Sequence, residues 1–418
     1  MSDLLGYRCS LCGQEYGPSE VEYICPKHGD LGNLDVVLDY ASIQRAASPE
    51  SISASGDFSI WRYLPLLPVA DPGFLGTPLR AVGWTPLYRA ERLAALLGLK
   101  RLFVKDDGRN PTASFKDRAS AIVVARARET GARVIAAAST GNAGAALAGL
   151  AAAAGMPAVI FAPQNAPPAK VAQLLMFGAQ VLLVNGNYDQ AFDLCLQASR
   201  EFGWYCRNTG YNPFTREGKK TAAFEISEQL SVSSEQWRAP DRVFVSVGDG
   251  NIISGMHKGF KDLFALGWIE KMPRLMGVQA EGSAACANAW AAGGEAITPV
   301  AAQTIADSIS VDLPRDGVRA VRAVRETGGA YIKVGDDDIL AAMRELANGL
   351  AVFAEPAGAA AYAGLAKAAR EGIIGPDETI VVLNTGNGLK DVKAAMQAAG
   401  EAVKIEPTML ALQRELSR

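Results

Sequence analysis

The sequence predicts an α/β protein built on parallel sheets, with a small separate module at the N-terminus. From residue 84 onward, short β-like runs alternate with Ala- and Leu-rich stretches of helical character. Such alternation is typical of parallel sheets covered by helices on both faces. Residues 1–40 break the pattern with two cysteine-bearing turns. The chain has 418 residues, which is enough for two or three domains.

The N-terminal module carries four candidate zinc ligands. Cys9 and Cys12 form one C-x2-C turn, and Cys25 and His28 form a second turn of the same spacing after twelve intervening residues. Zinc takes four N or S ligands in a tetrahedron, and each turn supplies two of them. The pattern predicts a zinc-ribbon-like module, residues 1–40, with a structural ion. The alternative is a ribbon that has lost its metal and simply buries its thiols.

The rest of the chain divides into a connector and alternating elements. Residues 41–80 are rich in Ser, Pro and Gly and predict an extended connector that wraps the body, so that 41–100 holds the connector and the start of a large domain. The predicted strands are Val134–Ala138, Ala158–Phe161, Val181–Val184, Val243–Val247, Leu275–Gln279 and Ile380–Leu383. The predicted helices are 143–154, 169–177, 188–202, 218–230, 253–266 and an amphipathic tail over 405–418.

Composition excludes several classes of partner. Hydrophobic residues make up 49% and charged residues 20%, the balance of a soluble globular protein. A net charge of −3 and a pI near 5.7 predict neither a nucleic-acid nor a membrane partner. No run reaches the ~18 apolar residues of a membrane span, and Met1–Leu5 does not resemble a secretion signal. The scattered Cys195, Cys206 and Cys286 fit reduced thiols, so we expect a cytoplasmic protein.

Lys116 is the strongest candidate for a catalytic residue. It lies between a strand-like run, residues 102–105, and a helical stretch that opens at Ala119, directly after the ring of Phe115. Partial burial at such a junction lowers the pKa of a lysine and leaves a neutral amine that can attack an aldehyde. A solvated lysine on a first helical turn is the ordinary alternative. The interpretation therefore depends on other turns of the chain.

Three turns that follow predicted strands can bind parts of a small molecule. The first presents small residues and N–H groups at a helix N-terminus, which suits a carboxylate; it consists of Ser139, Thr140, Gly141 and Asn142. The second is glycine-dense and suits a phosphate monoester; it consists of Gly248, Asp249, Gly250, Asn251 and Ile252. It matches neither a nucleotide P-loop nor a dinucleotide fingerprint. In the third, the hydroxyl of Thr385 can face a pyridine nitrogen without holding it protonated, or simply cap the next helix.

Together these segments resemble the fold-type-II enzymes that use pyridoxal 5'-phosphate. Within that family the chain is similar to the threonine synthases over most of residues 58–390, in the following segments: Trp61-Arg62-Tyr63 with Leu67-Pro68, Thr85-Pro86-Leu87, Asn110-Pro111-Thr112 with Ser114–Arg118, and Asn212-Pro213 with Glu217-Gly218, Lys220 and Thr221. The N-terminal cysteine module also resembles that of this group. The resemblance implies two parallel-sheet α/β domains with the cofactor in the cleft between them.

The resemblance also implies roles for individual residues. Lys116 would carry the cofactor and serve as the mobile acid and base. The expected cofactor-binding residues are Phe115, Lys116, Asn142, Gly248, Asp249, Gly250, Asn251, Ile252 and Thr385. The expected substrate-binding residues are Thr85, Lys105, Ser139, Thr140, Gly141 and Arg216. Lys105 and Arg216 are the candidates for holding a substrate phosphate, with one or both pointing into the cleft. A small domain, mostly 101–215, would carry Lys116, and a large domain, 216–418, would carry the phosphate turn and Thr385.

The implied reaction is a carbon–oxygen lyase reaction, the conversion of O-phosphohomoserine and water to threonine and phosphate. Several features depart from the family or are shared with its neighbours. Ala113 and Ala119 replace the usual glycines, and 304–311 is similar to the serine/threonine ammonia-lyases. The alternatives are an ammonia-lyase, a β-replacement enzyme such as cysteate synthase, and a non-catalytic protein that binds the cofactor or an amino acid. We expect a small amino-acid substrate, and a homodimer is an open alternative to a monomer.

Overall fold

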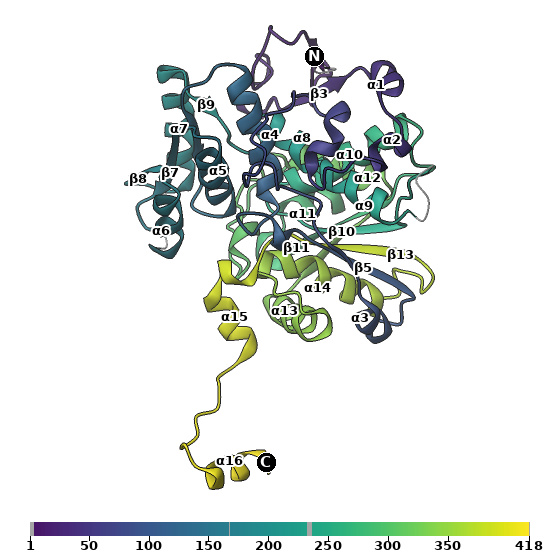
Figure 1. Cartoon of the computed structure of the whole chain (residues 1–418), viewed down its shortest axis with the longest axis vertical. Coiled ribbons are helices and arrows are strands. Elements are labelled where there is room, and N and C mark those ends of the chain that lie inside the picture. The colour runs from purple at the N-terminus through teal and green to yellow at the C-terminus, as the bar shows by residue number, and fades with distance from the viewer. Residues whose placement is uncertain (1–3, 167, 232–235, 418) are drawn as a thin grey trace.

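A computed structural model describes residues 4–166, 168–231 and 236–417. The described chain forms three sheets, one of six strands, one of four and one of three. In Figure 1 the three-stranded sheet lies at the top, the four-stranded sheet to one side, and the six-stranded sheet in the centre of the molecule. The prediction of an α/β fold with a small N-terminal module is confirmed.

The six-stranded sheet is parallel except for one edge strand. Its order is β12 (Tyr331–Val334), β11 (Arg274–Ala280), β10 (Arg242–Ser246), β13 (Thr379–Asn384), β5 (Arg101–Asp106) and β4 (Leu87–Arg89), with β4 antiparallel to β5. Side chains alternate between its faces: Val243 and Val245 join one hydrophobic core, while Phe244 joins another. The sheet takes β5 from the segment expected in the small domain, because residues 101–106 pair with β13 along their whole length.

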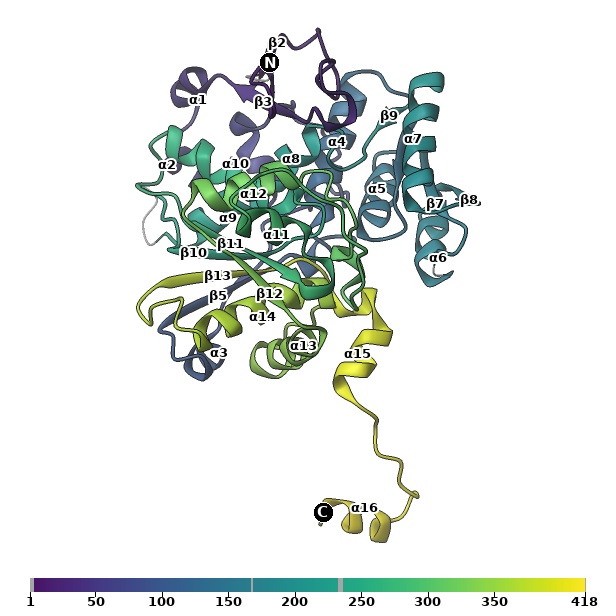
Figure 2. The ribbon, with the colours of Figure 1, turned by 180° about the vertical axis from the view of Figure 1, so that it is seen from behind.

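Helices cover both faces of this sheet, as Figure 2 also shows. One face carries α3 (Glu91–Leu96), α13 (Asp336–Leu350) and α14 (Pro356–Arg370). The other carries α8 (Phe214–Lys219), α9 (Thr221–Gln229), α10 (Asn251–Ala265), α11 (Ala285–Ala291) and α12 (Gly317–Glu326). The predicted helix 218–230 is thus α8 and α9, which meet at Lys220.

The four-stranded sheet is parallel throughout. Its order is β8 (Gln180–Val184), β7 (Ala158–Pro163), β6 (Ile135–Ala138) and β9 (Tyr205–Cys206). Its helices are α4 (Lys116–Glu129), α5 (Asn142–Ala153), α6 (Pro168–Met176) and α7 (Tyr188–Phe202). The Ala-rich stretch forms α5, where small side chains let the helix pack closely against α4.

The N-terminal sheet is an antiparallel ribbon of β1 (Leu4–Cys9), β2 (Glu15–Tyr16) and β3 (Leu34–Leu38). The connector after it is not wholly extended as predicted. It forms α1 (Tyr40–Ala46), α2 (Pro49–Ser53) and a 3₁₀ segment, Ile60–Leu66, because Asp39 and Ser48 accept N–H groups at the helix starts. Buried Arg62 ties the connector to α9 through an ion pair of 2.6 Å with Glu228.

The C-terminal segment leaves the body of the molecule. After α15 (Val392–Ala399) the chain extends to α16 (Met409–Leu416), which stands apart from the sheets in both views (Figures 1 and 2). The predicted tail helix is therefore present and shorter than 405–418. Within the described ranges, no helix combines the length and apolar character that a membrane crossing requires.

Candidate active site

A cavity of about 490 Å³ opens where the strands of both parallel sheets end. Strands β6, β10 and β13 each run into a turn that lines it, and Lys116 of α4 lies in its wall. Carboxyl ends of parallel strands lie at one edge of a sheet, so two such edges converge here. The cavity is lined by the three predicted turns and by polar residues from other segments, which include Tyr188, Arg207, Lys219, Ser246, Asp307 and Arg315.

Lys116 is the first residue of α4 and is half-buried, at the wall of the cavity. The preceding N–H of Phe115 donates to the carbonyl oxygen of Thr385 at 2.9 Å, which fixes the helix start against the end of β13. Burial lowers the pKa of Lys116; Glu355 opposes the shift and Arg207 adds to it. The side chain makes no hydrogen bond or ion pair with any described residue of the chain. An unpaired amine with a lowered pKa at the wall of a cavity loses its proton more readily, and in its neutral form it is a nucleophile and a proton acceptor.

The turn at residues 139–142 joins β6 to the N-terminus of α5. The Ser139 hydroxyl accepts the N–H of Gly144 at 3.0 Å, which holds the turn in shape. Asn142 donates through Nδ2 to Oε1 of Glu355 at 2.7 Å. Burial raises the pKa of Glu355, whose carboxyl group lies beside the cavity. The start of a twelve-residue helix favours an anion, as predicted for a substrate carboxylate.

The turn at residues 248–252 joins β10 to α10, a helix of 15 residues. Gly250 has φ of 90°, and a Cβ there would lie 2.7 Å from the carbonyl oxygen of Asp316. The Asp249 carboxylate is not free, because Oδ1 accepts the N–H of Arg315 at 2.9 Å. Asn251 donates through Nδ2 to Oδ2 of Asp316 at 2.7 Å. The segment 312–319 therefore holds the turn in place through the hydrogen bonds of Arg315 and Asp316.

Two buried cations of the cavity were missed by sequence reasoning. Arg207 follows β9; its Nη1 donates to Thr209 at 2.6 Å, whereas its Nη2 is buried without a partner. Burial lowers the pKa of Arg207 from 12.5 to about 10. Lys219 donates to Oδ1 of Asn251 at 2.6 Å. Its pKa lies well below the ordinary value, mainly because the side chain is buried and also because the positive charges of Arg207 and Lys116 are near. In the part of the chain that the structure describes, neither cation has a carboxylate within ion-pair distance.

The geometry corrects the expectation for a substrate phosphate. Lys105 does not point into the cavity: its amine bonds Glu225 at 2.6 Å and the carbonyl oxygen of Thr85 at 2.6 Å inside the core. Arg216 instead pairs with Asp35 of the N-terminal ribbon. Both cations are paired with carboxylates, the buried Glu225 and the half-buried Asp35, which the sequence alone could not assign as their partners.

Of the remaining predicted residues, some line the cavity and others lie outside it. The Thr85 hydroxyl donates to Asp107 at 2.6 Å in the core, so this residue also lies outside the cavity lining. Phe115 contributes its backbone, and its ring is buried. Thr385 and Ile252 line the cavity as predicted. The four predicted zinc ligands gather in the ribbon, and none lines the cavity.

Pyridoxal phosphate fits this cavity. It needs a neutral lysine for its aldehyde, an anion-binding turn for its phosphate, and a polar group at its ring nitrogen. Lys116, the turn at 248–252 and Thr385 supply these from three elements around one space. Ser246, at the end of β10, adds a buried hydroxyl that has no hydrogen-bond partner among the residues the structure describes.

Comparison with known proteins agrees with this geometry. The model of the family described as "Pyridoxal-phosphate dependent enzyme" matches residues 79–386. The chain belongs to this family. It is 40% identical to threonine synthase of Methanocaldococcus jannaschii and 39% identical to threonine synthase of Methanosarcina acetivorans, with 98% of each chain covered in both pairs.

Solved structures of pyridoxal-phosphate dependent enzymes share the fold. The processed form of threonine deaminase isoform 2 from Solanum lycopersicum superposes with a TM-score of 0.65 at 24% identity, over 82% of this chain and 88% of that one. This likeness concerns the fold alone. The cofactor of this pyridoxal-phosphate dependent enzyme is thus established by family and cavity together, while the substrate depends on the residues around it.

Proposed function

We propose that this protein is a threonine synthase, which converts O-phosphohomoserine and water to threonine and phosphate. Relatives of that name cover nearly the whole chain. The observation that carries the proposal is the pair of buried side chains Arg207 and Lys219, which have no carboxylate partner among the described residues. An unpaired buried cation is costly unless an anion binds it. A cofactor phosphate and a substrate phosphate together would account for both.

The positions of Lys219 and Arg207 suggest which phosphate each would bind. Lys219 is hydrogen-bonded to Asn251 of the turn at 248–252, so it would add charge beside the cofactor phosphate. Arg207 adjoins the carboxylate-binding turn, because the Oδ1 atom of the next residue, Asn208, accepts the N–H of Ala138 at 2.7 Å. It would therefore hold the phosphate of the substrate, the role that Lys105 and Arg216 cannot fill.

Bound pyridoxal phosphate supplies an electron sink that makes protons on the substrate carbon chain acidic. Lys116 would take the proton from Cα, because its amine is unpaired among the described residues, has a lowered pKa and is held at the cavity wall. The turn at 139–142 would fix the α-carboxylate, so that Cα lies at the lysine. A proton would then be lost from Cβ as the C–O bond at Cγ breaks, and Arg207 would stabilise the charge on the departing phosphate. Cγ and Cα would each take up a proton and water would add its hydroxyl at Cβ, which gives threonine.

An assay of products tests the substrate. The protein, loaded with pyridoxal phosphate, should release phosphate and form threonine from O-phosphohomoserine. Ammonia and a 2-oxo acid from serine or threonine should form far more slowly, because neither substrate carries a phosphate for Arg207. Efficient deamination with no phosphate release would replace the proposal by an ammonia-lyase.

We further propose that a second copy of the chain covers the C-terminal segment. Met409, Leu410 and Leu416 of α16 are between 58% and 79% exposed, and Met396 of α15 is 57% exposed. Apolar side chains on one detached helix favour a homodimer contact. Sedimentation of the full chain against one truncated after residue 400 tests this. A cytoplasmic location is proposed because the six cysteines are unpaired, including the buried neighbours Cys195 and Cys206.

A further inference from the structure

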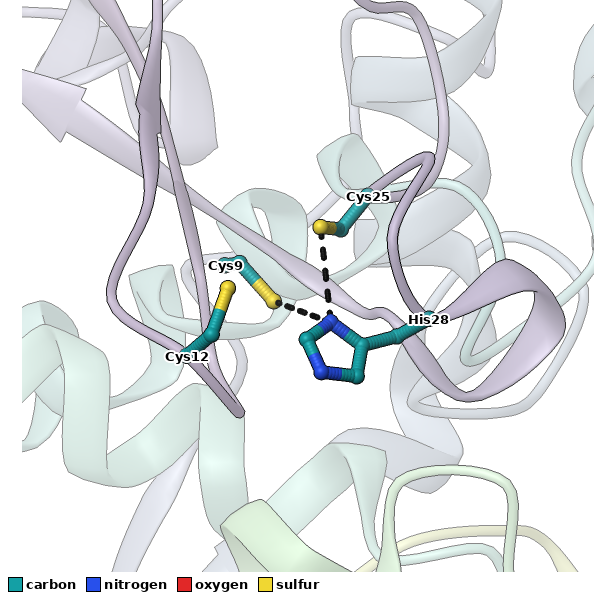
Figure 3. A group of neighbouring side chains, drawn as sticks. All are labelled: Cys9, Cys12, Cys25 and His28. Carbon is teal, nitrogen blue, oxygen red and sulfur yellow. Dashed lines mark hydrogen bonds between the residues drawn. The ribbon is translucent and has the colours of Figure 1, made fainter.

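Four side chains of the N-terminal ribbon converge on one point, as Figure 3 shows. The sulfur atoms of Cys9, Cys12 and Cys25 and a ring nitrogen of His28 all lie within 4.8 Å of one another. His28 Nδ1 lies 3.8 Å from Cys9 Sγ and 3.5 Å from Cys25 Sγ. They come from two turns that are separate in sequence and face each other across the ribbon.

These separations suit a tetrahedral zinc ion. With Zn–S near 2.3 Å and Zn–N near 2.0–2.1 Å, the edges of the tetrahedron are about 3.5–3.8 Å. Each turn is closed by a glycine N–H, from Gly13 to the Cys9 carbonyl at 3.0 Å and from Gly29 to the Cys25 carbonyl at 3.1 Å. Both glycines have positive φ, 70° and 52°. The Tyr16 hydroxyl lies 3.0 Å from Cys25 Sγ, where it can donate to a thiolate.

We propose that Cys9, Cys12, Cys25 and His28 bind one Zn²⁺, and that this ion makes the ribbon a brace for the cofactor-phosphate turn. The second part rests on the family's cofactor and not on the identity of the substrate. Four protein ligands leave no open position, so the role of the ion is structural.

The first link of the brace joins the metal turns to β3. Ser10 N–H donates to the carbonyl of Asn33 at 3.0 Å, and Cys25 N–H donates to the carbonyl of Gly32 at 2.8 Å. Both metal-binding turns are thereby hydrogen-bonded to the two residues directly before β3. If the four ligands separate, the hydrogen bonds that hold Gly32 and Asn33 in place are weakened.

The second link joins β3 to the large domain. Asn33 donates through Nδ2 to the carbonyl of Arg315 at 2.8 Å. Asp35 accepts from Nη1 of Arg319 at 2.8 Å and also pairs with Arg216. Arg216 and Arg319 hold the pKa of Asp35 below its usual range against the effect of burial, so the carboxylate stays charged.

The third link joins the same segment to the phosphate turn. Arg315 N–H donates to Asp249, and Asp316 accepts from Asn251 at 2.7 Å and from the Ser254 hydroxyl at 2.5 Å. The metal site is therefore connected to residues 249–254 through a series of hydrogen bonds and ion pairs. Ordering one end of such a chain favours the ordered state of the other.

A small ribbon needs such a constraint. Three strands, one of them two residues long, bury too little apolar surface to be stable alone. Among the ligands, Cys9 and Cys25 are buried and Cys12 is exposed, so the Cys12 thiol does not contribute to core packing. A change at Cys12 thus removes a ligand with little effect on the packing around it.

Metal analysis of the full-length holoenzyme, prepared without chelators, tests the site. Wild-type protein and a control variant at an exposed residue between two ligands, Lys27→Gln, should each carry about one equivalent of zinc. Cys12→Ser should bind zinc at least about 100-fold more weakly. Absence of zinc, a different metal in its place, or a Cys9–Cys12 disulfide would overturn the proposal.

The thermodynamic coupling between zinc binding and cofactor binding tests the brace. Chelation of zinc from wild-type protein should raise the dissociation constant for pyridoxal phosphate about fivefold or more, and cofactor should strengthen zinc binding by the same factor. Amide exchange should accelerate in residues 5–38, 312–319 and 248–254. Asp35→Asn should keep one zinc and lose the coupling. Zinc removal that leaves cofactor affinity and exchange at 248–254 unchanged would overturn the brace.

Discussion

Replacement of Arg207 by methionine should stabilise the fold and impair the reaction. Burial lowers the pKa of Arg207 from 12.5 to about 10. At about 1.4 kcal/mol per pH unit, the charged side chain costs about 3 kcal/mol in the folded state. Neutral pH lies below both pKa values, so this cost is fully present there and would fade only as pH rises through 10.

The variant also loses two hydrogen bonds, to Thr209 at 2.6 Å and to Ser120 at 3.3 Å. At about 1 kcal/mol each, they offset part of the gain and leave a net stabilisation of about 1 kcal/mol. The cost to the reaction is the loss of a charge-assisted contact with the substrate phosphate, about 1.5–3 kcal/mol. The value of kcat/KM for O-phosphohomoserine should therefore fall about 10- to 150-fold.

Urea unfolding and phosphate-release kinetics on the same holoenzyme preparations measure both effects. Added inorganic phosphate should stabilise the wild type and not the variant. Lys105→Met provides a matched contrast, because it removes a buried cation that is paired with Glu225. It should destabilise the fold by about 3–5 kcal/mol. If Arg207→Met destabilises as Lys105→Met does, or keeps full activity, Arg207 is a structural cation and the substrate assignment fails.

Two other outcomes follow from the site and its support. Lys116→Ala should abolish the absorbance at ~410–420 nm and the borohydride-stable adduct with pyridoxal phosphate. The circular dichroism spectrum should stay that of the wild type. An adduct that survives would exclude Lys116 as the lysine that binds the cofactor. Glu225→Gln should destabilise by about 3–5 kcal/mol, because Arg118 and Lys105 outweigh burial and lower the pKa of Glu225 to about 2. Its contribution is present above the ordinary carboxyl pKa and is lost as pH falls toward 2, so wild type and variant should converge in acid, and a constant difference would contradict this.

Sequence patterns predicted most strands of the two larger sheets closely, but missed β4, β9 and β12. Buried parallel strands are short continuous apolar runs, and β6, β7 and β10 each stood out between helical stretches. The sequence did not indicate as clearly to which sheet each strand belongs. Nothing local to residues 101–106 favours β13 over β6 as a neighbour, because the pairing closes over more than 270 residues. The two-residue β2 is too short to have a period at all.

The site was predictable where a backbone shape was required. Glycine at 248 and 250, between a strand and a helix, is visible in the sequence because side chains would collide there with Ile309 and Asp316. The cations were not, because a lysine or arginine has the same local pattern whether a carboxylate meets it or not. Arg207 offered one usable signal: it directly follows a strand, as the other cavity turns do.

Three consecutive charges at the start of α4 show why pairing decides function here. Arg118 forms ion pairs with Asp107 at 2.6 Å and with Glu225 at 2.5 Å. Asp117 accepts the N–H of Thr112 at 2.8 Å, and burial raises the pKa of Asp117 to about 6. Lys116 alone is left without a partner in the described chain. Asp117 and Arg118 thus fix the start of the helix, so that the amine of Lys116 stays unpaired at a fixed position and can react.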